Sequence, residues 1–210
     1  MLILKKTYFC VTVFFLTCAP FQTAFAAKLI LILGDSLSAG YGINKNEAWP
    51  TLLQQRLLQQ AKDYKVLNAS ISGETSAGGK ARIAALLTQH QPSIVIIALG
   101  ANDGLRGLSL KALRSNLHEI SSSAQKTKAS TLIIGMRLPP NFGSYGIDFY
   151  NSFGEVARST RSPLIPFLLE GIAEQADYFQ ADALHPNSKA QSKLLDNVWP
   201  TLAPLLERAR

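Results

Sequence analysis

Residues 93–99 read SIVIIAL, an uncharged run rich in β-branched side chains that lies between Pro92 and Gly100. A short continuous apolar run of this kind is typical of a strand that is buried on both faces of a sheet. Residues 28–33 (KLILIL) form a second such run, which ends at Gly34. These two stretches predict strands in the interior of a parallel sheet.

The rest of the chain alternates between strand-like and helix-like segments, with apolar residues at helical spacing between the apolar runs. The strand–helix order is repeated about five times. It predicts an α/β fold, a flavodoxin-like doubly wound sheet of five parallel strands with helices on both faces. A barrel of alternating strands and helices would need eight such units. Further strands are predicted at residues 65–69, 130–135 and 164–167, and helices at 49–57, 81–90, 110–120, 148–159 and from about 188 until just before 200.

The composition is that of one globular domain. Of the 210 residues, 47% are apolar and 17% are charged, whereas disordered chains combine low hydrophobicity with high charge. The net charge is +7, but no run of Lys or Arg exceeds two residues and aromatic residues are not interleaved with basic ones. A nucleic-acid partner is therefore not expected. The chain contains neither a G-x-G-x-x-G nor a P-loop pattern, so no nucleotide or flavin cofactor is expected either.

The first 26 residues have the pattern of a secretory signal peptide. Lys5 and Lys6 precede an apolar run at residues 8–16, and the AFAA sequence at 24–27 offers an A-x-A cleavage site after Ala26. A retained membrane anchor is the alternative, but the apolar run is shorter than the ~20 residues that span a bilayer.

We therefore expect a signal peptide at residues 1–26 and one globular domain at 27–210, exported to the periplasm of a Gram-negative cell or secreted. Removal of 26 of the 210 residues leaves 184, which is enough for a hydrophobic core. Two of the 21 basic residues are removed, so 19 remain against 14 acidic residues, a net charge of +5. Cys10 and Cys18 are also removed, which leaves no thiol or disulfide, and the residues before Cys18 match a lipid-attachment site poorly. A monomer without a stable membrane anchor is expected.

Parallel sheets of this class bind their ligands outside the carboxyl ends of the strands, so the loops that follow the strands are the places to search for a site. All of these loops are expected at one rim of the sheet, and each contains polar or conformationally special residues. They cover residues 34–38, 70–74, 100–104, 137–141 and 177–186.

His185 is the one histidine in a predicted rim loop, and it follows Asp182 by three residues. The other two, His90 and His118, fall within predicted helices. Free imidazole titrates near ~6.5, so His185 is the candidate general base. A serine hydroxyl needs such a base, and the base needs an acidic partner. Ser36, at the end of the first predicted strand, is the candidate nucleophile, with Asp182 as the partner of His185.

Acyl transfer also needs donors for a developing oxyanion, and Gly73 (backbone N–H) and Asn102 (side-chain amide) are candidates. Each residue also has a structural interpretation when taken alone. Ser36 is a possible helix N-cap, Gly73 a turn residue, and Asn102 part of an Asx-turn. Asp182 and His185 are a possible capping pair or two metal ligands. A metal site is not expected, because no third His or Cys lies nearby.

Four sequence blocks together resemble the GDSL, or SGNH, hydrolase family across the whole exported domain. The resemblance implies that Ser36 is the nucleophile, His185 the base and Asp182 its partner. It also implies an oxyanion hole formed by the N–H groups of Ser36 and Gly73 and the amide of Asn102. Ala101 stands where the nearest branch usually has Gly. The blocks are GDSLSAGYG (34–42), NASISGETS (68–76), GANDGLRG (100–107) and DALHPN (182–187).

A fifth stretch, RLPPNFG at residues 137–143, is similar to the periplasmic branch of thioesterases, arylesterases and lysophospholipases. We therefore expect a secreted serine hydrolase of acyl esters, thioesters or lysophospholipids that uses no cofactor or metal. A carbohydrate or peptidoglycan O-acetylesterase would use the same catalytic residues with a different pocket, and a flavodoxin-like binding module is the non-enzymatic alternative.

The loop at 74–80, with two adjacent glycines, is a candidate mobile segment. Five residues of the predicted rim loops are candidates for lining an acyl groove, although ordinary packing of the loops would explain them equally well. They are Arg106, Leu108, Leu138, Phe142 and Tyr145.

Overall fold

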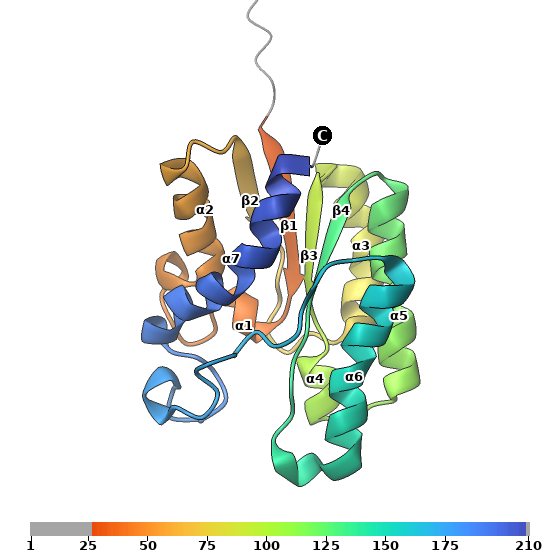
Figure 1. The fold of residues 1–210 in the computed structure, drawn as a ribbon, viewed down its shortest axis with the longest axis vertical. Coiled ribbons are helices and arrows are strands. Elements are labelled where there is room, and N and C mark those ends of the chain that lie inside the picture. Colours follow the sequence, from red (N-terminus) through yellow and green to blue (C-terminus); the bar gives the residue numbers. More distant parts are fainter. Residues whose placement is uncertain (1–26, 209–210) are drawn as a thin grey trace, which may run out of the picture.

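The computed structural model describes residues 27–208, so the predicted signal peptide lies outside the described residues. Five parallel strands form one sheet in the order β2-β1-β3-β4-β5 (Figure 1). This is the flavodoxin-like order, and it confirms the fold class predicted from the alternating apolar runs. The strands are β1 (Lys28–Gly34), β2 (Tyr64–Asn68), β3 (Ile94–Ala98), β4 (Ser130–Ile134) and β5 (Leu164–Ile165).

Helices cover both faces of the sheet, which Figure 1 shows nearly edge-on. On one face lie α2 (Trp49–Gln59) and α7 (Gln191–Arg208). On the other face lie α3 (Ser76–His90), α5 (Leu110–Lys126) and α6 (Gly143–Thr160). The short helices α1 (Ser36–Ala39) and α4 (Ala101–Leu105) follow β1 and β3 directly, at the carboxyl ends of these strands.

Alternate residues of the central strands point into two separate hydrophobic cores. Ile30 and Ile32 of β1 pack in the core beneath α2 and α7, whereas Leu31 and Leu33 pack in the core beneath α3, α5 and α6. All four side chains are fully buried. Successive side chains of a strand point to opposite faces, so a strand between two helical layers must be apolar at every position. This explains the continuous apolar runs in the sequence.

Helix α7 extends beyond Pro200, where the sequence predicts an end or a kink. Proline in a helix interior costs about 3 kcal/mol relative to alanine. After Pro200, however, Leu202, Leu205 and Leu206 are all buried in the core beneath α7. Each buried leucine contributes roughly 1.5–3 kcal/mol. The three together offset the cost of Pro200 and of Pro204, the second proline inside the helix.

Helix α3 begins at Ser76, so most of the segment predicted as a mobile loop at 74–80 is helical. The Thr75 side chain caps the helix by accepting a hydrogen bond from the Gly78 N–H. Gly79 faces the core, where an added Cβ would lie 2.2 Å from a methyl carbon of Leu99. The glycine therefore permits close packing of α3 on the sheet.

Short 3₁₀ helices interrupt the connecting loops and lie mainly at the carboxyl rim. The remaining predicted strands and helices agree with the structure to within a few residues, with two exceptions. Helix α6 starts five residues before the predicted helix at 148–159, and α5 ends six residues after the predicted helix at 110–120. Across residues 27–208, no helix has the length and apolar character needed to cross a membrane. The 3₁₀ helices are η1 (Lys45–Glu47), η2 (Pro140–Phe142), η3 (Ala176–Tyr178) and η4 (Ser188–Ala190).

Candidate active site

Ser36 is the first residue of α1, and only Asp35 separates it from Gly34, the last residue of β1. Asp35 has an extended backbone and caps α1, its carboxylate accepting the Leu37 N–H at 3.0 Å. The turn is crowded, since a Cβ on Gly34 would lie 2.9 Å from side-chain atoms of both Ser38 and Ser70. Glycine at position 34 therefore lets the strand turn sharply into the helix that carries Ser36.

His185 lies in a tight turn that begins at Gln180. The Gln180 N–H donates to the His185 carbonyl at 2.8 Å, and the Ala183 N–H donates to the Gln180 carbonyl at 2.9 Å. Ala183 has a φ of 54°, in the left-handed region. The Gln180 amide also donates to the Tyr41 carbonyl at 2.8 Å, which ties this turn to the loop after α1.

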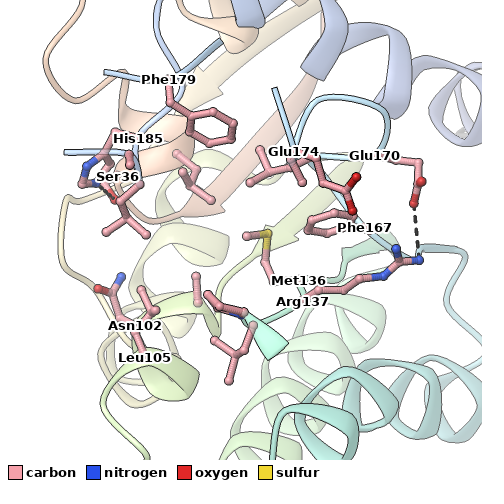
Figure 2. A pocket seen from close by; sticks show the side chains of 18 of the residues that line it. Ser36, Asn102, Leu105, Met136, Arg137, Phe167, Glu170, Glu174, Phe179 and His185 are labelled. Carbon is pink, nitrogen blue, oxygen red and sulfur yellow. Dashed lines mark hydrogen bonds and ion pairs between the residues drawn. The ribbon is translucent and has the colours of Figure 1, made fainter. Parts of the chain in front are cut away.

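Asp182, His185 and Ser36 form a continuous hydrogen-bonded chain. An Asp182 carboxylate oxygen lies 2.7 Å from His185 Nδ1. On the other side of the ring, His185 Nε2 lies 3.0 Å from Ser36 Oγ (Figure 2). The other Asp182 oxygen accepts the backbone N–H groups of Leu184 and His185, each at 3.0 Å. These bonds, above all those from His185, lower the pKa of Asp182 to about 2. The carboxylate is therefore charged across the neutral range and fixes the orientation of the imidazole.

Tyr41 packs against the imidazole, with the two ring centroids 4.5 Å apart and the rings tilted by 40°. The contact restricts rotation of His185 out of the hydrogen-bonded chain. Sequence analysis did not identify Tyr41, although it lies within the GDSLSAGYG block.

Gly73 and Asn102 lie beside Ser36 at the same rim, and both line the same cavity as Ser36. Gly73 has a φ of 80°, a conformation that favours glycine. Its backbone N–H and that of Ser36 have no hydrogen-bond acceptor among residues 27–208. The Asn102 amide donates to the Glu74 carbonyl at 3.0 Å, which leaves its second N–H for another acceptor.

Helix α4 holds the Gly73 loop through two further residues. The Arg106 guanidinium donates to the Gly73 carbonyl at 3.0 Å. The buried carboxylate of Asp103 accepts both the backbone N–H of Ser76, at 2.8 Å, and its hydroxyl, at 2.5 Å. Asn102 and Asp103 of α4 and its C-cap residue Arg106 therefore all bond to residues 73–76, the segment that carries Gly73.

A cavity of about 790 Å³ extends from Ser36 and His185 away along the rim (Figure 2). Its middle part is apolar, formed by side chains such as Met136, Leu138 and Phe167. Its far end carries charged groups from Arg137 and Glu170. The remaining lining residues are Leu37, Tyr41, Ser72, Gly73, Ala101, Asn102, Leu105, Pro139, Pro140, Leu169, Gly171, Ala173, Glu174, Gln175, Phe179, Ala183 and Leu184.

Residues 32–193 match the GDSL-like lipase/acylhydrolase family. The chain belongs to this family. The match spans most of the described fold, from β1 into α7, and includes all of the loops that form the rim. The resemblance noted from the four sequence blocks is thereby confirmed.

Two relatives of the family illustrate the similarity. Esterase TesA from Pseudomonas aeruginosa is 47% identical over 182 residues, which cover 86% of this chain and 90% of TesA. Thioesterase 1/protease 1/lysophospholipase L1 from Escherichia coli K12 is 40% identical over 193 residues, which cover 91% of each chain.

A crystal structure shows the same similarity in three dimensions. The psychrotrophic esterase EstA from Pseudoalteromonas sp., inhibited by monoethylphosphonate, superposes with a TM-score of 0.82. It is 41% identical in sequence, and the alignment covers 86% of this chain and 99% of EstA. An ester-hydrolase family is thus supported by both sequence and structure.

Of the five predicted groove residues, the structure places only Leu138 in the cavity lining. Arg106 instead holds the Gly73 carbonyl. The Tyr145 hydroxyl donates to the Leu108 carbonyl at 2.7 Å, and the Phe142 ring lies 6.4 Å from that of Tyr145. These residues pack loops against one another, which is the structural alternative that the sequence left open.

Sequence analysis missed one part of the cavity lining, the segment at residues 167–175, which contributes seven lining residues. This segment follows β5 and therefore satisfies the same rule that located the other rim loops. The predicted rim loop began at residue 177, ten residues too late. A search that started at the end of β5, Ile165, would have included the segment.

Asp35 is a buried titratable group next to the site, with an exposed fraction of 2%. Burial raises its pKa to about 7, although the Leu37 N–H and the charge of His185 oppose the shift. The nearby carboxylate of Asp103 adds to the increase. A carboxyl with a pKa near neutrality therefore lies directly beside the candidate nucleophile.

The other histidines lie away from this rim. His90 is the last residue of α3, and His118 is exposed on α5, 3.4 Å from the Ser122 hydroxyl. Between residues 27 and 208, no group of three or more His, Cys, Asp or Glu side chains has the arrangement of a metal site.

Proposed function

We propose that this chain is a serine hydrolase that cleaves acyl esters and thioesters through an acyl-enzyme. The observation that carries the proposal is the hydrogen-bonded chain from Asp182 through His185 to Ser36, at the mouth of an apolar cavity. A charged carboxylate behind the imidazole and a hydroxyl in front of it make a serine reactive toward a carbonyl carbon.

In the first step, the Ser36 oxygen attacks the carbonyl carbon of the substrate while His185 Nε2 accepts the hydroxyl proton. The lowered pKa of Asp182 keeps its carboxylate charged at neutral pH, and this negative charge stabilises the imidazolium that forms. The carbonyl oxygen becomes an oxyanion and accepts hydrogen bonds from the N–H groups of Ser36 and Gly73 and from the Asn102 amide. The imidazolium then protonates the leaving alcohol or thiol as the ester bond breaks.

In the second step, water attacks the acyl group on Ser36 and His185 accepts its proton. Collapse of the second tetrahedral intermediate releases the carboxylic acid, and the imidazolium returns its proton to the Ser36 oxygen. Both steps use the same three donors for the oxyanion. The overall reaction is therefore hydrolysis of one ester or thioester bond by one water molecule.

The apolar middle part of the cavity supports a substrate with an extended acyl chain. A volume of about 790 Å³ with Met136, Leu138 and Phe167 in its wall is far larger than an acetyl group needs. It therefore favours acyl esters, thioesters or lysophospholipids over the O-acetyl substrates considered from the sequence. The names of the relatives, an esterase and a thioesterase/lysophospholipase, agree with this choice.

Export completes the proposal, supported by the signal-peptide pattern at residues 1–26. Cleavage after Ala26 releases a monomeric enzyme that is not anchored in the membrane. N-terminal sequencing of the exported protein should therefore begin at Ala27, and light scattering should give the mass of one chain. A start before the apolar run, or a membrane-bound product, would contradict this part.

The test of the reaction is a panel of p-nitrophenyl esters, acyl thioesters and lysophospholipids of graded chain length. The exported enzyme is compared with its Ser36→Ala variant. We expect hydrolysis of medium or long acyl chains that depends on Ser36. Activity confined to acetyl esters would favour the deacetylase, and activity that survives in the variant would contradict the proposed nucleophile.

A further inference from the structure

A second hollow of about 400 Å³ lies against the far end of the acyl cavity. Both are lined by the same three residues, Arg137, Phe167 and Glu170, which therefore form a common wall. Beyond this wall, the second hollow is largely apolar. Its other lining residues are Tyr150, Ile165, Pro166, Asp196, Asn197 and Pro200.

Arg137 is the central element of the wall. Its guanidinium lies 5.0 Å from the ring centroid of Tyr150 and 4.8 Å from that of Phe167. It also forms an ion pair with the Glu170 carboxylate at 3.3 Å. Figure 2 shows this pair at the end of the cavity opposite to Ser36 and His185. The side chain is thus held on three sides where an acyl chain lying in the cavity would end.

We propose that Arg137 sets the upper limit of acyl-chain length by closing the cavity at this wall. This inference rests on the proposed function, because it takes the apolar cavity to be the acyl site. To pass this wall, a hydrocarbon end would have to displace the guanidinium from the rings of Tyr150 and Phe167 and from Glu170. The terminal methylenes of a longer chain therefore stop at Arg137.

Removal of the guanidinium would join the two hollows. The chain end would then meet Tyr150, Ile165 and Phe167, which line the second hollow and offer apolar surface. Each methylene that becomes buried there should raise kcat/KM roughly fourfold, the gain expected from its transfer out of water. The effect is a gain of activity on long chains, which loss of fold or of general activity would not produce.

The experiment measures kcat/KM of the exported enzyme and its Arg137→Ala variant on p-nitrophenyl esters from C4 to C16, below their micelle concentrations. For an ester two carbons longer than the wild-type optimum, we expect the ratio to the optimum ester to rise roughly sixteenfold, which is fourfold for each added methylene. Activity on the shortest esters should change little, because their chains do not reach the wall. An unchanged profile, or a uniform loss at every length, would overturn the proposal.

Two matched variants separate the wall from other effects. Arg137→Lys keeps a cation and an aliphatic stem at the wall and should keep the wild-type chain-length limit. Arg158→Ala removes an exposed arginine of α6 that lines neither hollow and should also leave the limit unchanged. A shift in the Arg158→Ala profile equal to that of Arg137→Ala would assign the effect to charge alone and overturn the proposal.

Ser36→Ala, measured in parallel, distinguishes the two possible failures. If this variant retains turnover, the proposed function itself is wrong. If it is inactive while Arg137→Ala keeps the wild-type profile, the hydrolase assignment remains supported and only the wall is wrong.

Discussion

The two ends of the acyl cavity are built on different physical principles. At the reacting end, Ser36, His185 and Asp182 are fixed by hydrogen bonds of 2.7–3.0 Å between side chains. At the far end, Arg137 and Glu170 have side chains that are 46% and 62% exposed, and the wall depends on the cation–π contacts of Arg137 and one ion pair. We infer that the reacting end tolerates little change, whereas substitutions at the far end alter which substrates are used.

His185→Gln should have the largest effect, because it removes the base from the reacting end while leaving the cavity intact. Triad members act as a unit, so we expect kcat to fall by roughly four to six orders of magnitude. The chain-length preference of any residual activity should be unchanged. Stopped-flow or end-point assays with the optimum ester measure this loss. A fall in kcat of less than tenfold would contradict the inference that the reacting end tolerates little change.

Asn102→Ala should reduce kcat by about two to three orders of magnitude, the usual cost of losing one oxyanion donor. Because the amide also donates to the Glu74 carbonyl at 3.0 Å, the variant needs a stability control. Thermal unfolding should show only a small decrease in melting temperature, so that unfolding of the variant does not account for the loss of kcat. If kcat stayed within a few-fold of wild type, Asn102 would hold the loop without contacting the oxyanion.

Asp35→Asn tests how much the buried charge of Asp35, next to Ser36, lowers the stability of the folded protein. The Asp35 pKa is raised from an ordinary value of 3.8 to about 7, so between these values the folded state holds a proton that the unfolded chain has lost. The contribution of this group to stability therefore falls as pH rises through that window. Asparagine cannot ionise and can still accept the Leu37 N–H. The variant should be more stable than wild type at pH 8, by up to roughly 4 kcal/mol, and close to it at pH 4.

Urea unfolding of both proteins at pH 4 and pH 8 measures this difference. Wild-type stability should decline from pH 4 toward pH 8 by more than that of the variant. An equal difference between the two proteins at both pH values would mean that burial of the Asp35 charge is not what separates them.

Arg106→Ala should lower kcat about fivefold with little change in KM, since one hydrogen bond contributes roughly 1 kcal/mol. The reason is positional, because Arg106 holds the Gly73 carbonyl at 3.0 Å and does not line the cavity. Arg106→Lys, which retains a donor, should recover part of the activity. A change confined to KM would instead indicate contact with the substrate, as the sequence first suggested.

Glu170→Gln should have the smallest effect. Exposed ion pairs contribute only 0–1 kcal/mol, so the melting temperature should change little. Arg137 keeps its contacts with Tyr150 and Phe167, so kcat/KM on short esters should match wild type and the chain-length limit should move less than in Arg137→Ala. A large loss on short esters would contradict the separation between the two ends.

The sequence predicts the reacting end better than the far end, for a physical reason. Parallel strands carry their loops to one rim, so Ser36, Asn102 and His185 are expected to meet wherever the strands are found. The far end depends on packing between segments distant in sequence, such as Arg137 on Tyr150 and Phe167. No local pattern records those contacts.

Packing also explains the errors in the fold prediction. Pro200 signals a helix end, but the leucines after it are buried and keep α7 helical. The glycines at 78 and 79 suggest a loop, but Gly79 allows α3 to approach Leu99 closely. In both cases tertiary contacts override a local preference, and only coordinates show them.

The central claim is that the acyl group is transferred to Ser36. Rapid quenching of the enzyme with a slowly hydrolysed p-nitrophenyl ester, followed by peptide mass spectrometry, tests it directly. The peptide that contains Ser36 should carry the mass of one acyl group, and the Ser36→Ala protein should carry none. Continued turnover with no acylated peptide, or an acyl group on a different side chain, would contradict the account.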